Sequence, residues 1–472
     1  MNHSTTLLRA GTIAALAGCL CLTPLMGCSS DDDATGEEGL NTQEGSDNQG
    51  TANAGEGGDN NSSPGNNDDP SDPNNGDNNN VAPNNSDPNH NTSPPNQADE
   101  LPEGSLTTVT LMDDTVAMDE GYTDYITIDV PDDVYSLAIT VTEGDPDDNF
   151  LVTDWSDDSG FYIVPEGWEE TQQICYQNCN NRTMPRPGAY GILAPNNPDS
   201  QANPGEHQFR VHAMDMPEIA FQFAEPSVGT SESVRVTVHA EIVDNEVPDT
   251  GTINLNLFFS GANDWDADTA ASDPDFQAML DEVDQVYDQV GIDLGDISYH
   301  DVSSDYQVLS DIMSGSGDMA QMMTESIRGD YVGPSVFFVS ELDAFGGIFG
   351  KDGAPGDSLQ QGVGGVLGIS AGIPGPMIID GSPASGVAVA VDSSMAEGSP
   401  GLTHVVAHEL GHYLGLFHTS EQVAFGPTPE HDPLPDTPEN DTTYLMHATG
   451  DGDTLSEWQG RVMRKNPWVY HD

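Results

Sequence analysis

One short motif constrains the fold of this chain more than any other feature. Residues 408–418 read His-Glu-Leu-Gly-His-Tyr-Leu-Gly-Leu-Phe-His. Because residues four apart on an α-helix lie on one face, about 6 Å apart along the axis, His408 and His412 project together and can share one metal ion. Gly415 lets the chain leave the helix through a left-handed conformation, which can bring His418 back as a third ligand. The motif therefore predicts a helix followed by a sharp return around a metal.

The residue types of the motif also predict its chemistry. Three histidine nitrogens leave one position of a tetrahedral zinc ion open, and an open position distinguishes catalytic zinc from closed structural zinc. Zinc lowers the pKa of a bound water to about 7. Glu409 lies beside the first ligand and could take a proton from that water during attack on a peptide carbonyl, then return it to the leaving amine. Ordinary helix histidines are the alternative, but they require all these residues to coincide by chance.

Residues downstream of the motif extend the pattern. Thr419 directly follows the third histidine, Asp436-Thr437-Pro438 lies beyond it, and Tyr444-Leu445-Met446 comes next. Together with the motif, these residues resemble the metzincin clan of zinc peptidases, and within it the pappalysin-type bacterial members. The resemblance covers residues 246–472. It implies a metzincin-like α/β zinc peptidase domain, with Met446 in a Met-turn beneath the metal and His408, His412 and His418 as zinc ligands.

The sequence departs from this family pattern at two places. The cysteines that usually brace the loop after the zinc motif are missing, so packing or ions must hold residues 421–443. Some metzincins carry a tyrosine ligand two residues after the Met-turn methionine, but that position is Ala448 here. Four acids follow the motif: Glu430, Asp432, Asp436 and Asp441. They could form a Ca²⁺ site, or they could be ordinary solvated surface residues.

Two further histidines lie close to the motif. His404 precedes His408 by four residues and shares its helix face, but the ligand count is complete without it. We therefore expect His404 to be packed or solvent-facing. His447 follows Met446 and could touch substrate, with an ordinary surface histidine as the alternative.

Residues 105–245 have the pattern of an all-β sandwich. Short alternating runs are separated by clusters of Asp, Gly, Pro and Asn, which is typical of antiparallel strands. The clearest strand segments are residues 107–112, 124–130, 136–142, 207–212 and 233–239. No catalytic constellation occurs among them. We expect an accessory domain or a pro-domain.

Residues 246–472 alternate between strand and helix patterns. Residues 252–259 predict a strand with one apolar face, and Asp273 with Pro274 can begin a helix that Gly291 ends. Further strands are expected at residues 292–302, 334–339 and 386–391, and Ser399 can cap the helix of the metal motif. The fold class is thus multidomain, with an all-β sandwich followed by an α/β domain.

Residues 1–28 have the features of an export signal. Arg9 precedes the apolar run of residues 11–22, which is too short to span a bilayer. The run closes on Leu25-Met26-Gly27-Cys28, which resembles the lipobox of bacterial lipoproteins, where the cysteine is lipidated and becomes the new N-terminus. This resemblance implies a lipid anchor on Cys28 that attaches the protein to a membrane. Ordinary secretion is the alternative.

Residues 29–104 are a low-complexity stretch of Asn, Asp, Gly, Pro and Ser without Lys or Arg. Such a stretch cannot bury enough apolar surface to offset its ordering entropy, so we expect a disordered acidic linker. Over the whole chain, 80 Asp plus Glu stand against 10 Lys plus Arg, a formal net charge of −70. A polyanion of this kind repels phosphate, which excludes nucleic acid as a partner.

Export would determine which cysteines remain free to form a disulfide in the mature chain. Cys19 and Cys21 would leave with the signal, and Cys28 would carry lipid, so Cys175 and Cys179 remain as one pair. An oxidising compartment favours a disulfide between them. The alternative is that one of the two binds the metal as a thiolate and keeps the protein latent.

These features together predict an exported zinc-dependent endopeptidase acting on protein or peptide substrates. We expect it in the bacterial cell envelope, lipid-anchored at the outer membrane or cell surface, or secreted. The competing class is a lipid-anchored surface binding module with a catalytically idle protease fold, or a zinc-dependent adhesin. Because all three ligands and the base Glu409 are present, we favour the enzyme.

Overall fold

The computed structural model describes residues 106–167, 180–215, 227–243, 247–343, 366–396, 399–421 and 430–471. The predictions for the signal segment, for Cys28 and the linker, and for Cys175 and Cys179 lie outside these residues. None of the described helices is long and apolar enough to cross a membrane. The domain boundaries expected above remain predictions.

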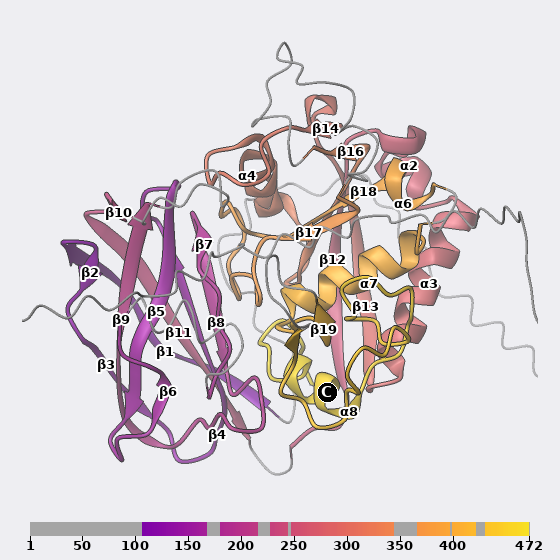
Figure 1. The fold of residues 1–472 in the computed structure, drawn as a ribbon. Coiled ribbons are helices and arrows are strands. Elements are labelled where there is room, and N and C mark those ends of the chain that lie inside the picture. The colour runs from indigo at the N-terminus through magenta and orange to yellow at the C-terminus, as the bar shows by residue number, and fades with distance from the viewer. Residues whose placement is uncertain are drawn as a thin grey trace, which may run out of the picture. The chain divides into compact units, whose positions relative to one another are not determined.

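Residues 106–243, here called the β-rich region, form one antiparallel sheet with the strand order β6-β5-β9-β2-β1-β11-β4-β8 (Figure 1). All five predicted strand segments overlap strands of this sheet. The strands are β1 (Leu106–Asp119), β2 (Tyr122–Thr123), β3 (Ile126–Val130), β4 (Val134–Thr142), β5 (Asp148–Asp157), β6 (Tyr162–Val164), β7 (Arg186–Pro187), β8 (Tyr190–Ala194), β9 (Gly205–Asp215), β10 (Ser227–Val228) and β11 (Ser233–Val243).

The long strand β1 joins the two halves of this nearly closed sheet. It pairs with β11 along most of its length and with β2 at its end. Apolar residues from both halves share one core, as the alternation along β11 and β4 requires. Ser136, Ala138 and Thr140 on the opposite face of β4 are also buried, so this face is covered as well.

Residues 251–471, here called the α/β region, contain a five-stranded sheet with the order β13-β12-β15-β18-β17. The first four strands are parallel, and β17 is antiparallel to β18. The strands of this sheet are β12 (Gly251–Phe259), β13 (Ile292–Asp301), β15 (Ser335–Val339), β17 (Gly368–Ser370) and β18 (Val387–Ala390). Two separate pairs are formed by β14 (Val308–Leu309) with β16 (Glu341–Leu342) and by β19 (Ser420–Glu421) with β20 (Glu430–His431).

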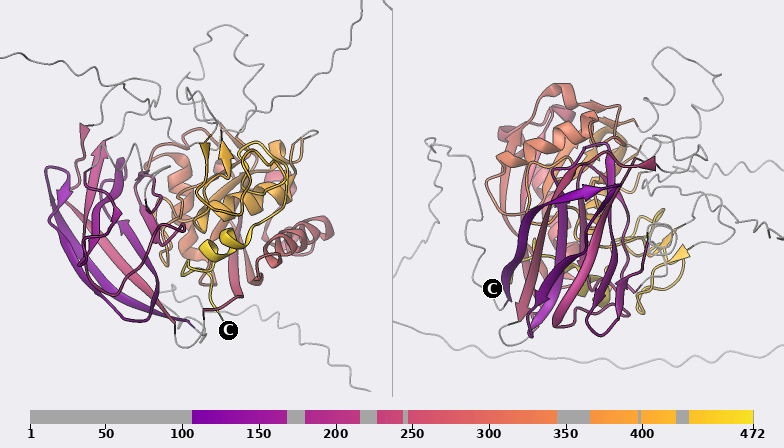
Figure 2. Two further views of the ribbon diagram at one scale, coloured as in Figure 1. Left: turned by 60° about the horizontal axis from the view of Figure 1, so that its bottom comes forward. Right: turned by 90° about the vertical axis from the view of Figure 1, so that its left-hand side faces the viewer.

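The helices of the α/β region lie beside this sheet, with α3 and α7 next to each other (Figure 1). Both views of Figure 2 show the β-rich strands grouped together in indigo to magenta. The α-helices are α2 (Ala267–Ala270), α3 (Pro274–Asp288), α4 (Asp318–Met323), α6 (Val391–Ser394), α7 (Leu402–Tyr413) and α8 (Glu457–Met463). Short 3₁₀ turns cover Ala262–Asp264, Ser304–Tyr306 and Thr324–Arg328.

Helix α3 confirms the sequence prediction in detail. The Asp273 carboxylate accepts the backbone N–H groups of Asp275 and Phe276, Pro274 occupies the first turn, and Gly291 beyond the end has φ +71°. The apolar residues of the helix are buried: Phe276, Met279, Leu280, Val283, Val286 and Tyr287. The hydroxyl of Tyr287 donates to the carbonyl of Ala407 at 2.8 Å, which ties α3 to the metal-motif helix.

One local prediction is confirmed and one was wrong. Strand β12 has the expected apolar face, which is buried, and Asn256 on the other face is fully buried as well. Its amide donates to the carbonyls of Tyr331 and Gly333, so a loop distant in sequence covers it. Helix α7 begins at Leu402 after Gly401, whose φ is 98°, and not after Ser399. The Ser399 hydroxyl instead donates to the carbonyl of Ser394.

Glu241 on β11 lies on the covered face of the sheet, opposite the shared core, and its burial can be tested. Its side chain is 5% exposed and accepts a hydrogen bond from Thr108. Burial raises the pKa of Glu241 to about 7, so the native state favours the protonated acid. The stability from this group is present below its unfolded pKa and is lost as the pH rises through 7.

Replacing Glu241 with Gln should therefore stabilise the protein at high pH. We expect the free energy of unfolding to rise by about 3 kcal/mol near pH 8 and to stay unchanged near pH 4. Urea unfolding of wild type and Glu241→Gln at both pH values measures the difference. If the free energies of unfolding of the two proteins differ by the same amount at both pH values, the assigned burial of Glu241 is contradicted.

Candidate metal centre

Helix α7 carries the first two histidines of the motif at a buried position. All residues from Val405 to Tyr413 are buried, so the helix lies inside the α/β region. After the helix ends, Gly415 adopts φ +112°, a conformation that disfavours any residue with a Cβ. The chain therefore turns back sharply and places His418 beside the helix.

The structure brings His408, His412 and His418 into one cluster. The Nε2 atom of His418 lies 3.3 Å from Nε2 of His408 and 3.2 Å from Nε2 of His412. Among the described residues, these three histidines form a group of side chains that could hold one metal ion. Their ligand atoms all lie within 4.8 Å of one another.

Hydrogen bonds at the other ring nitrogen orient each histidine. The Nδ1 atom of His408 lies 2.7 Å from the carbonyl of Leu445, and that of His412 lies 2.6 Å from the carbonyl of Leu416. A carbonyl only accepts, so each Nδ1 must carry the proton and each Nε2 presents a lone pair. The Nδ1 atom of His418 lies 2.9 Å from the Glu421 carboxylate, which only accepts, so this Nδ1 also carries a proton.

The electrostatics favour the uncharged form of the two helix histidines. Burial, and to a smaller extent the neighbouring imidazoles, hold the pKa of His408 and of His412 well below the usual value. Neutral imidazole is the form that binds metals.

The spacing of the three nitrogens fits one tetrahedral ion. Two nitrogens that each lie about 2.0–2.1 Å from a tetrahedral zinc are separated by about 3.3–3.4 Å. The observed separations of 3.2 and 3.3 Å agree with this value. A metal ion between the three nitrogens could accept a lone pair from each of them. The residues present therefore could bind a metal ion.

Glu409 lies on the same helix, beside the first ligand. Its side chain is 3% exposed, and one of its oxygens, Oε2, has no hydrogen-bond partner among the described residues. Burial raises the pKa of Glu409 to about 8, against the backbone N–H of Ser370 and the positive charge of Arg186, which both lower it. A buried carboxylate of this kind is suited to hold a proton.

Met446 lies directly against helix α7 and is fully buried. A Cβ added to Gly411 would lie 2.7 Å from the Met446 sulfur, so this close approach requires glycine. The backbone carbonyl of Met446 accepts the N–H of Thr419 at 2.8 Å, next to the third histidine. The turn at 445–446 thus contacts both the helix and the returning segment.

The two other histidines near the motif have partners of their own. His404 Nδ1 lies 2.9 Å from the carbonyl of Gly452, and its ring centroid is 5.5 Å from that of His408. His447 is 8% exposed, and its Nδ1 accepts the backbone N–H of Thr449. Neither joins the metal cluster in the described part of the chain.

The acids considered for calcium are held by local hydrogen bonds. Asp432 accepts from Thr437, Asp436 accepts the backbone N–H of Trp458, and the exposed Asp441 accepts from Thr443. Within the described residues they do not form a group of three ligands. The side chain of Glu430 lies outside the description, so the calcium site stays a prediction.

Three contributors to the site were not foreseen from the sequence. Glu421 orients His418, Ser370 donates to Glu409 from strand β17, and Arg186 brings a positive charge from the β-rich region. Glu421 stands three residues after His418, but no spacing rule marks it as a partner. The other two are distant in sequence and left no local signal.

Comparisons with known proteins give only weak structural likenesses. No family model and no curated protein matches the sequence. The crystal structure of metalloproteinase-II from Bacteroides fragilis aligns with 11% identity and a TM-score of 0.27, covering 50% of this chain and 63% of that one. A structural genomics target from Bacillus subtilis aligns with 10% identity and a TM-score of 0.13, covering 45% and 44%. The chain thus spans less than two thirds of either protein.

Substitution of His408 should abolish metal stabilisation, whereas substitution of His404 should not. Zinc at about 100 times its dissociation constant should stabilise the wild type by about 2.7 kcal/mol. We expect His408→Ala to lose this gain and His404→Ala, four residues away on the same helix, to keep it. Thermal unfolding with and without zinc measures the effect. An equal loss in both variants would contradict the assigned ligand set.

Proposed function

We propose that this chain is a zinc-dependent endopeptidase whose α/β region is metzincin-like. The observation that supports this most is the convergence of three histidine ligand atoms, two of them from the helix that also carries the buried Glu409 with its unpartnered oxygen. Three protein ligands leave one coordination position for water or substrate, as in catalytic zinc sites. A closed structural site would need a fourth protein ligand, and the described residues place none in the cluster.

Glu409 serves as the general base in this proposal. When bound, zinc lowers the pKa of a water molecule to about 7 and polarises a peptide carbonyl. The carboxylate of Glu409 would accept a proton from the attacking water as the water oxygen bonds to the carbonyl carbon. Glu409 would then donate this proton to the leaving amine nitrogen as the C–N bond breaks, which restores the base. Burial of Glu409 favours its protonated form, which suits the second step.

Strand β17 connects the sheet to the proposed base. It is the last strand in the described order of the sheet, its residues are buried, and its Ser370 donates a backbone N–H to Glu409. We propose proteins or peptides as substrates, because a base beside three histidine ligands matches the chemistry of metal-assisted peptide hydrolysis.

The peptidase proposal predicts a strong effect of Glu409→Gln. This variant keeps the side-chain size but cannot accept the proton, so casein hydrolysis by the zinc-loaded full-length chain should fall by about 10²–10⁴-fold. Zinc content should stay unchanged. Glu341→Gln, at an exposed position on β16, is the matched control and should keep full activity.

The competing function is a surface binding module with an idle protease fold. That function predicts a zinc-loaded wild type that hydrolyses no protein. Absence of casein hydrolysis by the zinc-loaded wild type, or equal activity in wild type and Glu409→Gln, would contradict the peptidase proposal.

We also propose that a lipid on Cys28 holds the enzyme at a membrane of the cell envelope. A flexible linker of about 76 residues would place the folded part roughly 50 Å from the anchor. Cys28→Ala should release the protein from the membrane fraction into the medium, because the acidic chain has no electrostatic attraction to anionic lipid. Immunoblots of fractionated cells measure this. A wild type that is already free in the medium would contradict the anchor.

A further inference from the structure

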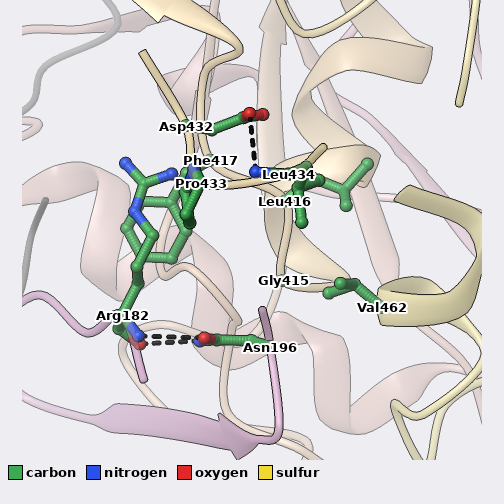
Figure 3. Close-up of a pocket in the computed structure, with 9 residues that line it drawn as sticks. All are labelled: Arg182, Asn196, Gly415, Leu416, Phe417, Asp432, Pro433, Leu434 and Val462. Carbon is green, nitrogen blue, oxygen red and sulfur yellow. Dashed lines mark hydrogen bonds between the residues drawn. The ribbon is translucent and has the colours of Figure 1, made fainter. Parts of the chain in front are cut away.

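The short stretch that delivers the third histidine contacts the β-rich region. Residues 415–417 connect the end of α7 to His418, and they line a pocket together with Arg182 and Asn196 of the β-rich region (Figure 3). Figure 3 shows the head group of Arg182 against the ring of Phe417. Side chains from a separate part of the chain therefore surround the connection to a metal ligand.

Arg182 is held in place by its own neighbours. Its backbone N–H donates to the side-chain oxygen of Asn196 at 2.9 Å, and the Asn196 amide donates back to its carbonyl at 2.7 Å. The guanidinium carbon lies 4.0 Å from the centroid of the Phe417 ring, within the range of a cation–π interaction. Met184 packs against the same ring together with Ile373. Phe417 immediately precedes His418, so both contacts act on the ligand's nearest neighbour.

Leu193 contacts the other end of the same stretch. It lies on β8, is fully buried, and its Cδ2 atom is 3.5 Å from the position that a Cβ on Gly415 would take. Leu193 and Ala138 belong to the same hydrophobic cluster as Leu410 and Leu414 at the end of α7. The β-rich region thus packs on the glycine at which the chain turns back.

The two regions fit together too closely for a loose association. Thr140 accepts the backbone N–H of Met377 at 3.1 Å, and the Ser136 hydroxyl donates to the carbonyl of Lys465 at 2.7 Å. A Cβ on Gly191 would lie 2.5 Å from the carbonyl oxygen of Gly375, so the backbones touch directly. Tight packing of this kind transmits displacement instead of absorbing it.

We propose that the β-rich region is a positioning element of the metal centre. Arg182, Met184 and Leu193 hold residues 415–417 so that Nε2 of His418 faces the other two histidines. This inference rests on the proposed metallopeptidase function. It also decides between the two roles left open by the sequence, because a region that positions a ligand must remain in place and is not a removable pro-domain.

Zinc affinity of the full-length chain tests this role. Leu193→Ala is compared with Ile192→Ala, since Ile192 is the neighbouring residue on β8, is equally buried, and lies in the core of the β-rich region. Arg182→Ala is compared with Arg210→Ala, since Arg210 lies over the Tyr122 ring at 4.5 Å within the β-rich region. Competition with a chelating indicator gives each zinc dissociation constant, and thermal unfolding without metal shows the general loss of stability.

We expect Leu193→Ala and Arg182→Ala to weaken zinc binding by roughly 10-fold or more, as substitutions that misorient metal ligands do. The two controls should stay within about twofold of the wild type, although Ile192→Ala should lower the unfolding temperature about as much as Leu193→Ala. If Leu193→Ala does not fold, Leu193→Val is used instead, since it shortens the side chain by only one methylene. We expect Leu193→Val to weaken zinc binding as well, but by a smaller factor.

Zinc affinities that are equal in the test and control variants overturn the proposal. A rise in peptidase activity with unchanged zinc affinity also overturns it, because the β-rich region would then be an inhibitory cover. A wild type that binds no zinc overturns both this inference and the proposed function. A wild type that binds zinc, with test variants that bind it equally well, overturns the inference alone.

Discussion

Three histidine Nε2 atoms, with that of His418 3.3 and 3.2 Å from the other two, impose the constraint on which the rest of the site depends. Burying polar nitrogens this close together costs free energy. Helix α7, the turn at Gly415 and the carbonyls of Leu445 and Leu416 nevertheless hold the rings in this arrangement. A cation between the nitrogens converts the same geometry from unfavourable to favourable.

The buried Glu409 on the same helix is under a related constraint. Desolvation raises the pKa of Glu409, and the described residues leave one of its oxygens without a partner. A carboxylate that water cannot solvate gains stability from a nearby cation. Metal binding and the ionisation of Glu409 therefore support each other, which explains why both groups tolerate burial on one helix.

Much of this arrangement could be predicted from the sequence because it depends on local spacing. The helical offset of His408 and His412, the glycine at 415 and the Asp273 cap of α3 each follow from residues within one or two turns. Contacts between distant segments could not be predicted. Asn256 is buried by a loop more than 70 residues away in sequence, and Leu193 meets Gly415 across more than 200 residues.

X-ray absorption at the zinc edge of the zinc-loaded full-length protein tests the central claim most directly. The account predicts three imidazole nitrogens and one oxygen at about 2.0–2.1 Å from the metal. A sulfur neighbour at about 2.3 Å would instead place a cysteine on the ion. A sulfur neighbour, or fewer than three imidazole nitrogens bound to zinc, would contradict a centre built from His408, His412 and His418.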